Sequence, residues 1–296
     1  MISFIDLGAQ HREVAEEIRA RLEEEIRAAR FILGPAVTRF EEAMAGYHGV
    51  RHGIGVASGT DALLLSLLAA DIGPGDEVIT TPFTFVATAE VILHAGATPV
   101  FADIEEDTFN IDPALVEGAV SEKTKAIIPV HLYGLPAKME ELGALAARKN
   151  LRVIEDCAQS TGAKVGGRLT GSFGDTGAFS FFPTKNLGGF GDGGMVLTDD
   201  DHLAGKVRML HGHGSRERDS YELAGYNSRL DSIQAAVLEI KLGRLEEWNG
   251  MRRQSAALYR ELLADLEEIR LPAEPDGSTH VYNQFTLVAE RRDELR

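Results

Sequence analysis

The chain has 296 residues, of which 44% are hydrophobic and 26% are charged, a composition ordinary for a soluble protein with one large domain and a smaller one. Its 46 acidic residues outnumber its 30 basic ones, and the net charge of −16 argues against nucleic acid or an anionic membrane as the main partner. The single cysteine, Cys157, excludes an intramolecular disulfide, and the sequence lacks both an apolar run of roughly 20 residues and a signal-peptide start, so we expect a cytoplasmic protein.

Two helices are predicted at the beginning of the chain. In residues 11–30, apolar side chains recur at helical spacing, at Val14, Ile18, Leu22, Ile26 and Ala29. The FILGP stretch interrupts this pattern, and VTRFEEAMAGYHG predicts a second helix that ends near Gly49.

Strands and helices then alternate through residue 157. The predicted strands are GIGVA, the end of GPGDEVITT, ATPVFADI, TKAIIPVHLYG and LRVIEDCAQS. The predicted helices between them are TDALLLSLLAADI, TFVATAEVILHAG, PALVEGAV and MEELGALAARKN. This alternation predicts an α/β fold of three layers, with helices on both faces of a mainly parallel sheet. Ligands of such sheets bind beyond the carboxyl ends of the strands.

The C-terminal part of the chain predicts a long helix followed by a smaller α/β unit. Residues 232–268 have helical periodicity, with Leu238, Leu242, Leu245 and Trp248 expected in the core. HVYNQFTLVAE predicts a strand, and RRDELR predicts the first turn of a helix. We therefore expect a large domain at residues 1–240 and the start of a small, truncated domain at residues 241–296.

The GVASGTDALLL stretch places Gly59 and Thr60 between a strand and a helix. Unpaired N–H groups and the helix dipole make such a turn suitable for a phosphate group. The alternative is a helix cap with no ligand.

Glycine motifs leave a nicotinamide-dependent oxidoreductase open as another alternative. Gly189, Gly191 and Gly194 match G-x-G-x-x-G, and Gly53, Gly55 and Gly59 resemble it loosely. The dinucleotide fingerprint must follow a strand and open a helix, whereas the Gly189 motif precedes the predicted strand MVLT. The glycines alone therefore favour this class of enzyme only weakly.

Lys185 lies in FSFFPTKNLGGFGDGGMV, an apolar and glycine-rich stretch where a lysine is either an exposed charge or a buried reactive amine. Asp156 ends a predicted buried strand, and Gln159 follows one turn later. Pyridoxal 5'-phosphate needs an amine, an acid for its pyridine nitrogen and an anion site for its phosphate. Lys185, Asp156 and the Gly59–Thr60 turn supply all three, with Gln159 expected near the phenolic oxygen of the ring.

These motifs together resemble the DegT/StrS family of pyridoxal-phosphate-dependent sugar aminotransferases, which has the aspartate-aminotransferase-like fold type I. The resemblance extends from FIDLGAQ to YNQFTLV and includes SGTDAL, VIEDCAQSTGA, SFFPTKNLGGFGDGG and GYNSRLDSIQAAVL. It implies that Lys185 is the catalytic residue and binds the cofactor covalently. The other cofactor-binding residues it implies are Gly59, Thr60, Asp61, Phe85, Asp156, Gln159, Ser180 and Asn227.

The family resemblance also implies the partners and the reaction. Asn227 would reach the phosphate from the partner subunit, so a homodimer with shared sites is expected, and Arg229 is a candidate contact for an anionic group of the substrate. The implied reaction transfers an amino group from L-glutamate to a nucleotide-linked keto sugar, with a 3-keto group favoured over a 4-keto group. We expect no metal site. His211 and His213 are either residues of the sugar pocket or solvated loop residues.

Two further alternatives have the same expected fold. One is a non-catalytic relative that binds cofactor or sugar nucleotide as a sensor, and the other is a cofactor-dependent sugar dehydratase. The dehydratases carry histidine where this chain has Lys185, so the lysine favours an aminotransferase.

Overall fold

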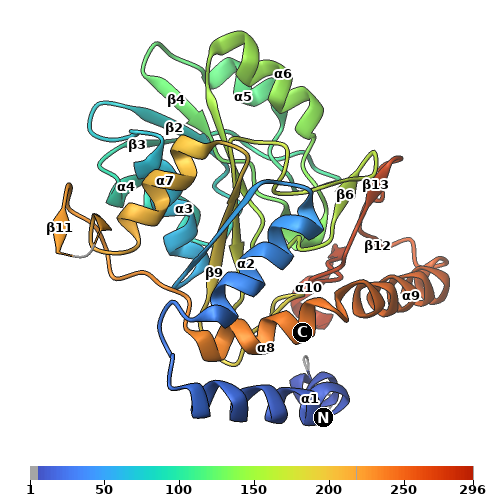
Figure 1. The fold of residues 1–296 in the computed structure, drawn as a ribbon. Helices are drawn as coiled ribbons and strands as arrows, with labels where there is room; N and C mark the ends of the chain where they lie inside the picture. Colours follow the sequence, from blue (N-terminus) through green and yellow to red (C-terminus); the bar gives the residue numbers. More distant parts are fainter. Residues whose placement is uncertain (1–5, 218, 296) are drawn as a thin grey trace.

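A seven-stranded sheet runs through the computed structural model, which describes residues 6–217 and 219–295 (Figure 1). Its strands lie in the order β1-β9-β8-β5-β4-β2-β3. Their bounds are His52–Val56 (β1), Gly194–Thr198 (β9), Thr176–Ser180 (β8), Arg152–Asp156 (β5), Thr124–Ile127 (β4), Glu77–Thr80 (β2) and Thr98–Phe101 (β3). Only β9 is antiparallel to its neighbours, so the prediction of a mainly parallel sheet is confirmed.

Helices cover both faces of the sheet, and alternate residues of one strand show this. On β9, Val196 packs in a core with helices α3 (Gly59–Ala69), α4 (Ala87–His94) and α7 (Asp201–Leu210). Met195 and Leu197 of the same strand point to the opposite face, where they meet α2 (Pro35–His48) and α8 (Ser232–Leu242). Helices α5 (Pro113–Ala119) and α6 (Met139–Lys149) complete this second layer beside β4 and β5. The three predicted layers are therefore present (Figure 1).

The N-terminal helix α1 (Leu7–Ala28) packs on the outer side of α8. Val14 and Ile18 are buried there with Val237 and Trp248. The expectation that Ile26 belongs to this apolar stripe is wrong, because its side chain is 59% exposed. Phe4 and Ile5 of the FIDLGAQ motif lie outside the described residues.

The long helix predicted over residues 232–268 is two helices, α8 and α9 (Leu245–Leu263). The break falls at Gly243 and Arg244, which form a turn in which the N–H of Arg244 donates to the carbonyl of Lys241 at 3.0 Å and φ widens to −106° at Arg244. Glycine is a weak helix former because it has no side chain to restrict the backbone. The break lets Leu238 and Leu245 pack toward α2 while Trp248 packs toward α1.

The predicted strand HVYNQFTLVAE is wrong over most of its length. Only β14 (Val288–Ala289) is extended and paired, with β12 (Ile269–Arg270). Residues 280–282 are buried without a strand partner, because Val281 donates its N–H to the carbonyl of Gly134 in a turn. Long-range contacts with this turn therefore override the extended pattern of the local sequence.

Short elements complete the described chain. They are the 3-10 turn η1 (Leu132–Gly134), the ribbon β6 (Lys164–Val165), β7 (Arg168–Leu169) and β13 (Ser278–Thr279), the hairpin β10 (Ser215–Glu217) and β11 (Ser220–Tyr221), and α10 (Arg292–Leu295). Predicted strand TKAIIPVHLYG ends early, at Ile127, because Pro129 and η1 follow it. None of the helices at residues 6–217 and 219–295 combines the length and apolarity that a membrane crossing requires.

Candidate active site

A cavity of about 430 Å³ lies where the carboxyl ends of β1, β5 and β8 meet. Seven of the residues expected at the site line it: Gly59, Thr60, Phe85, Asp156, Gln159, Ser180 and Lys185. These residues span more than 120 positions of the chain, from Gly59 to Lys185, and come from the ends of different strands. The sheet topology therefore brings most of the predicted site into one place.

The turn between β1 and α3 forms one wall of the cavity. Ser58 caps α3, since its hydroxyl accepts a hydrogen bond from the N–H of Asp61 at 3.0 Å. Gly59 lies directly against Ser180, and a Cβ added at Gly59 would come within 2.6 Å of the Ser180 Cβ. Only glycine therefore lets the Ser180 hydroxyl lie beside the N-terminus of α3. A helix N-terminus with adjacent hydroxyl groups is a suitable site for a phosphate.

Asp156 supplies a buried carboxyl group at the end of β5. Its Oδ2 accepts a hydrogen bond from the hydroxyl of Thr88 at 2.9 Å, and its Oδ1 accepts one from the N–H of Ala158 at 3.1 Å. Burial raises the pKa of this carboxyl above its ordinary value, although both hydrogen bonds and the charge of Lys185 oppose the shift. A cationic N–H group in the cavity would stabilise the ionised form, and this is what a protonated pyridine nitrogen offers.

Lys185 lies in a turn in which its own N–H donates to the carbonyl of Phe182 at 2.9 Å. Burial lowers the pKa of its amine, and the nearby charge of Asp156 opposes that effect. Within residues 6–217 and 219–295 no carboxylate forms an ion pair with it. An amine with a lowered pKa has a larger neutral fraction, and the neutral form is the nucleophile and the base.

Gln159 and Phe85 occupy other parts of the cavity wall. The Oε1 of Gln159 accepts a hydrogen bond from the N–H of Tyr133 at 2.6 Å, which leaves its NH₂ group to donate toward the cavity. Phe85 is 71% exposed in the loop between β2 and α4, an unusual position for a large aromatic side chain without a ligand or partner.

The lining of the cavity fits pyridoxal phosphate. It offers an amine of lowered pKa, a buried acid that needs a cationic neighbour, and a cradle beside Gly59 that a Cβ would fill. The aromatic ring of Phe85 is free to stack on a planar ligand. Thr88 also lines the site and was not anticipated from the sequence, although its place in the first turn of a helix after TPFTF was a usable signal.

Three expected residues do not line this cavity: Asp61, Asn227 and Arg229. The carboxylate of Asp61 accepts a hydrogen bond from the hydroxyl of Ser228 at 2.7 Å, and its N–H is already bonded to Ser58. Asn227 is exposed and pairs through its backbone with Gly212. Arg229 is half-buried and lies close enough to His211 to lower the pKa of that histidine, whose larger cause is burial. His213 is exposed.

A buried cluster behind the cavity joins His131, Glu155 and Cys157, whose ligand atoms lie within 4.8 Å of one another. Both nitrogens of His131 are engaged, since Nδ1 accepts from the N–H of Ala137 at 3.0 Å and Nε2 lies 3.0 Å from Glu155. The Glu155 carboxylate also accepts three backbone N–H groups, from Gly171, Phe173 and Gly174. These hydrogen bonds give the cluster a structural role in fixing the end of β5.

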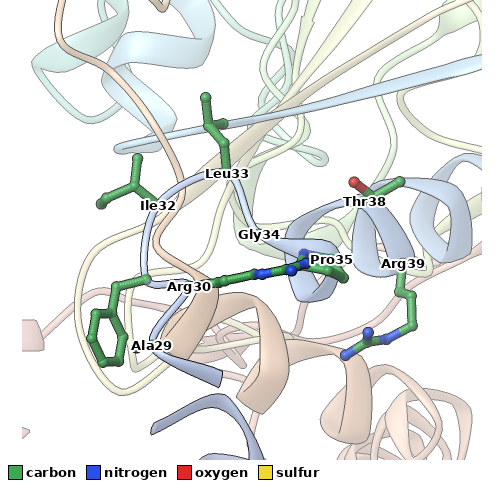
Figure 2. A pocket seen from close by; sticks show the side chains of 9 residues that line it. Ala29, Arg30, Ile32, Leu33, Gly34, Pro35, Thr38 and Arg39 are labelled. Carbon is green, nitrogen blue, oxygen red and sulfur yellow. The ribbon is translucent and has the colours of Figure 1, made fainter. Parts of the chain in front are cut away.

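A second, larger hollow of about 750 Å³ lies at the turn between α1 and α2. Figure 2 shows Ile32 and Leu33 extending from the connecting turn, while Thr38 and Arg39 extend from α2. Phe31, Ile32 and Leu33 are 42%, 48% and 51% exposed, which makes this turn an apolar surface. The residues that line this hollow carry no carboxylate, thiol or imidazole group, whereas the cavity at Lys185 is lined by the carboxyl groups of Asp156 and Asp192.

Comparison with known proteins gives consistent matches over the whole chain. The sequence model described as the DegT/DnrJ/EryC1/StrS aminotransferase family matches residues 12–296. A "Pleiotropic regulatory protein" of Geobacillus stearothermophilus is 51% identical over 297 residues, which cover 100% of this chain and 80% of the relative. A UDP-N-acetyl-3-dehydro-alpha-D-glucosamine 3-aminotransferase of Acidithiobacillus ferrooxidans is 49% identical over 295 residues, with coverage of 100% and 80%.

The fold comparison agrees with the sequence comparison. The crystal structure of S. venezuelae DesV in complex with a ketimine intermediate superposes with a TM-score of 0.98 at 47% sequence identity. The match covers 100% of this chain and 80% of the DesV chain. The similarity therefore includes every strand and helix that forms the cavity.

Proposed function

Because the chain belongs to the DegT/DnrJ/EryC1/StrS aminotransferase family, which is pyridoxal-phosphate-dependent, we propose that it transfers an amino group from L-glutamate to a 3-keto group of a nucleotide-linked sugar. The Acidithiobacillus ferrooxidans relative, whose name specifies a 3-dehydro sugar and a 3-aminotransferase, supports the position of the keto group. Aminotransferase activity on nucleotide sugars in amino-sugar biosynthesis is the shared function of such relatives.

The observation that carries the proposal is that Lys185 and Asp156 line the same cavity as the phosphate-suited turn at Gly59. A sensor that only binds a sugar nucleotide has no need for an amine that lines the same cavity as a buried carboxyl group. A nicotinamide enzyme needs its glycine motif after a strand and before a helix, whereas Gly189, Gly191 and Gly194 lead into β9.

Each residue of the cavity has a distinct task in this reaction. Pyridoxal phosphate, when bound, supplies an electron-withdrawing ring that stabilises negative charge on the carbon beside the transferred nitrogen. Asp156 would keep the ring nitrogen protonated, and Thr88 holds the Asp156 carboxylate in place with its hydroxyl. Gly59, Thr60 and Ser180 would hold the phosphate, and Phe85 would lie against the ring. Lys185 Nζ takes the proton from the α-carbon of the amino donor, because its lowered pKa favours the neutral amine.

Absorption spectroscopy tests the function directly. The purified protein, loaded with pyridoxal phosphate, is expected to show a visible band that bleaches on addition of L-glutamate, and Lys185→Ala should lose or alter that band. A panel of nucleotide-linked 3-keto and 4-keto sugars is then added, and the sugar that restores the band identifies the acceptor. A protein that stays colourless with added cofactor would contradict the proposal and favour a sensor.

We also propose a homodimer in which each cavity is completed by the partner subunit. Asn227 and Arg229 lie outside the cavity of their own chain, which supports their use at the partner's site. The exposed turn at Phe31, Ile32 and Leu33 lies beside the segment that carries Asn227 and Arg229, since Ile32 forms a backbone bridge with Asp231. An exposed apolar surface of this kind is typical of an interface between proteins.

Hybrid dimers test the shared site. Lys185→Ala and Asn227→Ala remove residues that, in this proposal, belong to different subunits of one site. Each variant alone should be impaired, but an equal mixture that exchanges subunits should regain about a quarter of the wild-type activity, since half of the dimers then hold one intact site of two. A mixture that regains nothing, while sedimentation shows exchange, would contradict the shared site.

A further inference from the structure

Asn186, the residue after Lys185, is buried and forms three hydrogen bonds with the C-terminal part of the chain. Its NH₂ group donates to Asn249 Oδ1 at 2.8 Å and to the carbonyl of Val281 at 2.9 Å. Its Oδ1 accepts from the NH₂ group of Asn283 at 2.9 Å. A side-chain amide offers two donors and one oxygen, so the donor capacity of Asn186 is used completely.

Asn249 extends this connection from α9 to the loop after β5. Its NH₂ group donates to the carbonyl of Thr161 at 3.0 Å, and the next residue is Gly162 with φ +94°. A Cβ at Gly162 would come within 2.5 Å of the Asn249 Nδ2, so the close approach requires glycine. The lysine turn, α9 and the loop that carries Gln159 are therefore held together by side-chain amides.

Residues 280–284, which we call the strap, connect the same two walls of the cavity by a second route. On one side of the strap, the carbonyl of Val281 and the NH₂ group of Asn283 bond to the side chain of Asn186. On the other side, Val281 donates its N–H to the carbonyl of Gly134 at 3.0 Å, and Gln284 donates its N–H to the carbonyl of Tyr133 at 3.2 Å. The N–H of Tyr133 in turn donates to the Gln159 side chain. The strap thus links the turn of Lys185 to the residue expected at the phenolic oxygen.

We propose that Asn186 is a positioning residue through which the strap and α9 fix the place of Lys185 in the cavity. A lysine side chain has a flexible stem of four carbons, and among the residues that the structure describes no carboxylate forms an ion pair with the Lys185 amine, so its location depends on how its backbone is held. The Phe182 carbonyl holds that backbone at the N–H of Lys185, and the amide network holds it one residue later. The inference deepens the proposed function and rests on it for the role of Lys185.

The alternative is that the network contributes only to stability, because any buried amide that loses three partners destabilises a protein. Asn110 provides a matched control for that effect. It is buried to the same degree, donates to the carbonyls of Leu135 and Pro136, and accepts from the N–H of Leu132. It has no hydrogen bond to the lysine turn.

The decisive measurement is the reactivity of the Lys185 amine in the cofactor-free protein. Competitive acetylation with acetic anhydride from pH 7 to 11, read by mass spectrometry of the Lys185 peptide, gives the pKa of this amine. Asn186→Ala should loosen the lysine turn, expose the Lys185 amine further to water and raise that pKa by about one unit, which is about a tenfold lower labelling rate at pH 8. Asn110→Ala should leave the labelling rate within about twofold of wild type. In the loaded enzyme, Asn186→Ala should lower kcat by about tenfold with little change in KM for L-glutamate.

Each outcome decides the inference. Equal labelling and equal kcat in Asn186→Ala and Asn110→Ala would overturn it. If Asn186→Ala does not fold, Asn283→Ala removes only one of the three bonds and should shift the Lys185 pKa in the same direction by a smaller amount; no shift in that variant would equally overturn it. Because acetylation uses neither cofactor nor substrate, the labelling result still tests the positioning role of Asn186 if the aminotransferase proposal fails.

Discussion

Lys241, which is buried, and Lys185, which is half-buried at the cavity, lie on either side of the glycine-rich loop, and they illustrate what a reactive amine requires. Lys241, on α8, is 4% exposed and donates from Nζ to the carbonyl of Gly188 at 2.6 Å. Its ammonium also lies 5.0 Å from the ring centre of Phe190. Burial lowers the pKa of Lys241 to about 8 and also lowers that of Lys185. A lowered pKa is therefore common to both, and of the two only Lys185 lines the cavity that also contains Asp156 and the N-terminus of α3 at Gly59.

The same contrast exists between the two adjacent carboxylates at the end of β5. Glu155 is buried among four hydrogen-bond donors supplied by the protein itself, while Asp156 has two and lies at a cavity. A group whose hydrogen bonds are complete supports the fold. A group with unused capacity beside a cavity is available for a ligand.

Replacing each lysine by methionine should give the largest difference. Lys185→Met removes the amine that reacts and moves the proton, so kcat for the glutamate half-reaction should fall by about 10³-fold or more. Lys241→Met keeps the apolar stem and removes only a packed charge, so kcat should stay within about tenfold of wild type. Stopped-flow absorbance with L-glutamate measures both rates. Comparable losses in the two variants would break the distinction between the lysines.

The Asp156 carboxylate should show the next largest effect on the rate. Asp156→Asn keeps the shape, because its amide oxygen can accept from the N–H of Ala158 while its NH₂ group donates to the hydroxyl oxygen of Thr88, but it removes the negative charge that favours a protonated ring nitrogen. We expect kcat to fall by about 10²–10³-fold, as when one electrostatic stabiliser of a transition state is lost. Circular dichroism should show an unchanged fold. A kcat near that of wild type would mean that Asp156 has no electrostatic partner in the loaded enzyme.

Glu155→Gln should affect stability instead of chemistry. Both Glu155 oxygens face N–H donors, so an NH₂ group at either position would meet a donor and leave a buried polar pair unsatisfied. We expect a loss of about 2–3 kcal/mol in the free energy of unfolding, measured by urea denaturation. The kcat of the folded fraction should change much less than in Asp156→Asn. A larger loss of kcat than in Asp156→Asn would reverse the assignment of the two acids.

The sequence was sufficient for the parts of the site that local patterns define. Gly59, Asp156 and Lys185 each stand at the end of a strand or in a distinctive loop, and the topology of parallel sheets predicts that such ends meet. Alternation of strands and helices likewise predicted the three layers. These features depend on neighbours within a few residues, which the sequence displays directly.

Features that depend on distant contacts could not be predicted in this way. Asn186 bonds to Val281 across 95 positions, and nothing near either residue indicates the pairing. The strap has the composition of a strand but is bonded to a turn and to side chains. Thr88 acquires its role only because α4 is packed against the end of β5. In each case tertiary contacts decide what the local pattern leaves open.

The smallest expected effect is the pH dependence of stability caused by Lys241. Its pKa is about 8 in the folded protein and 10.5 in an ordinary lysine, so between these values the unfolded chain binds more protons than the folded one. Stability from this group therefore rises as the pH increases from 8 to 10.5, and below pH 8 the full cost of burying the charge is present.

In Lys241→Met that cost is absent at every pH. The melting temperature of Lys241→Met minus that of wild type should thus fall by about 3 °C between pH 7.5 and pH 10. Lys185 is present in both proteins, so its own contribution cancels in the difference. A difference that stays constant over this range would mean that Lys241 remains charged in the folded protein, held by Gly188 and Phe190, and its burial would then carry no cost that titration can remove.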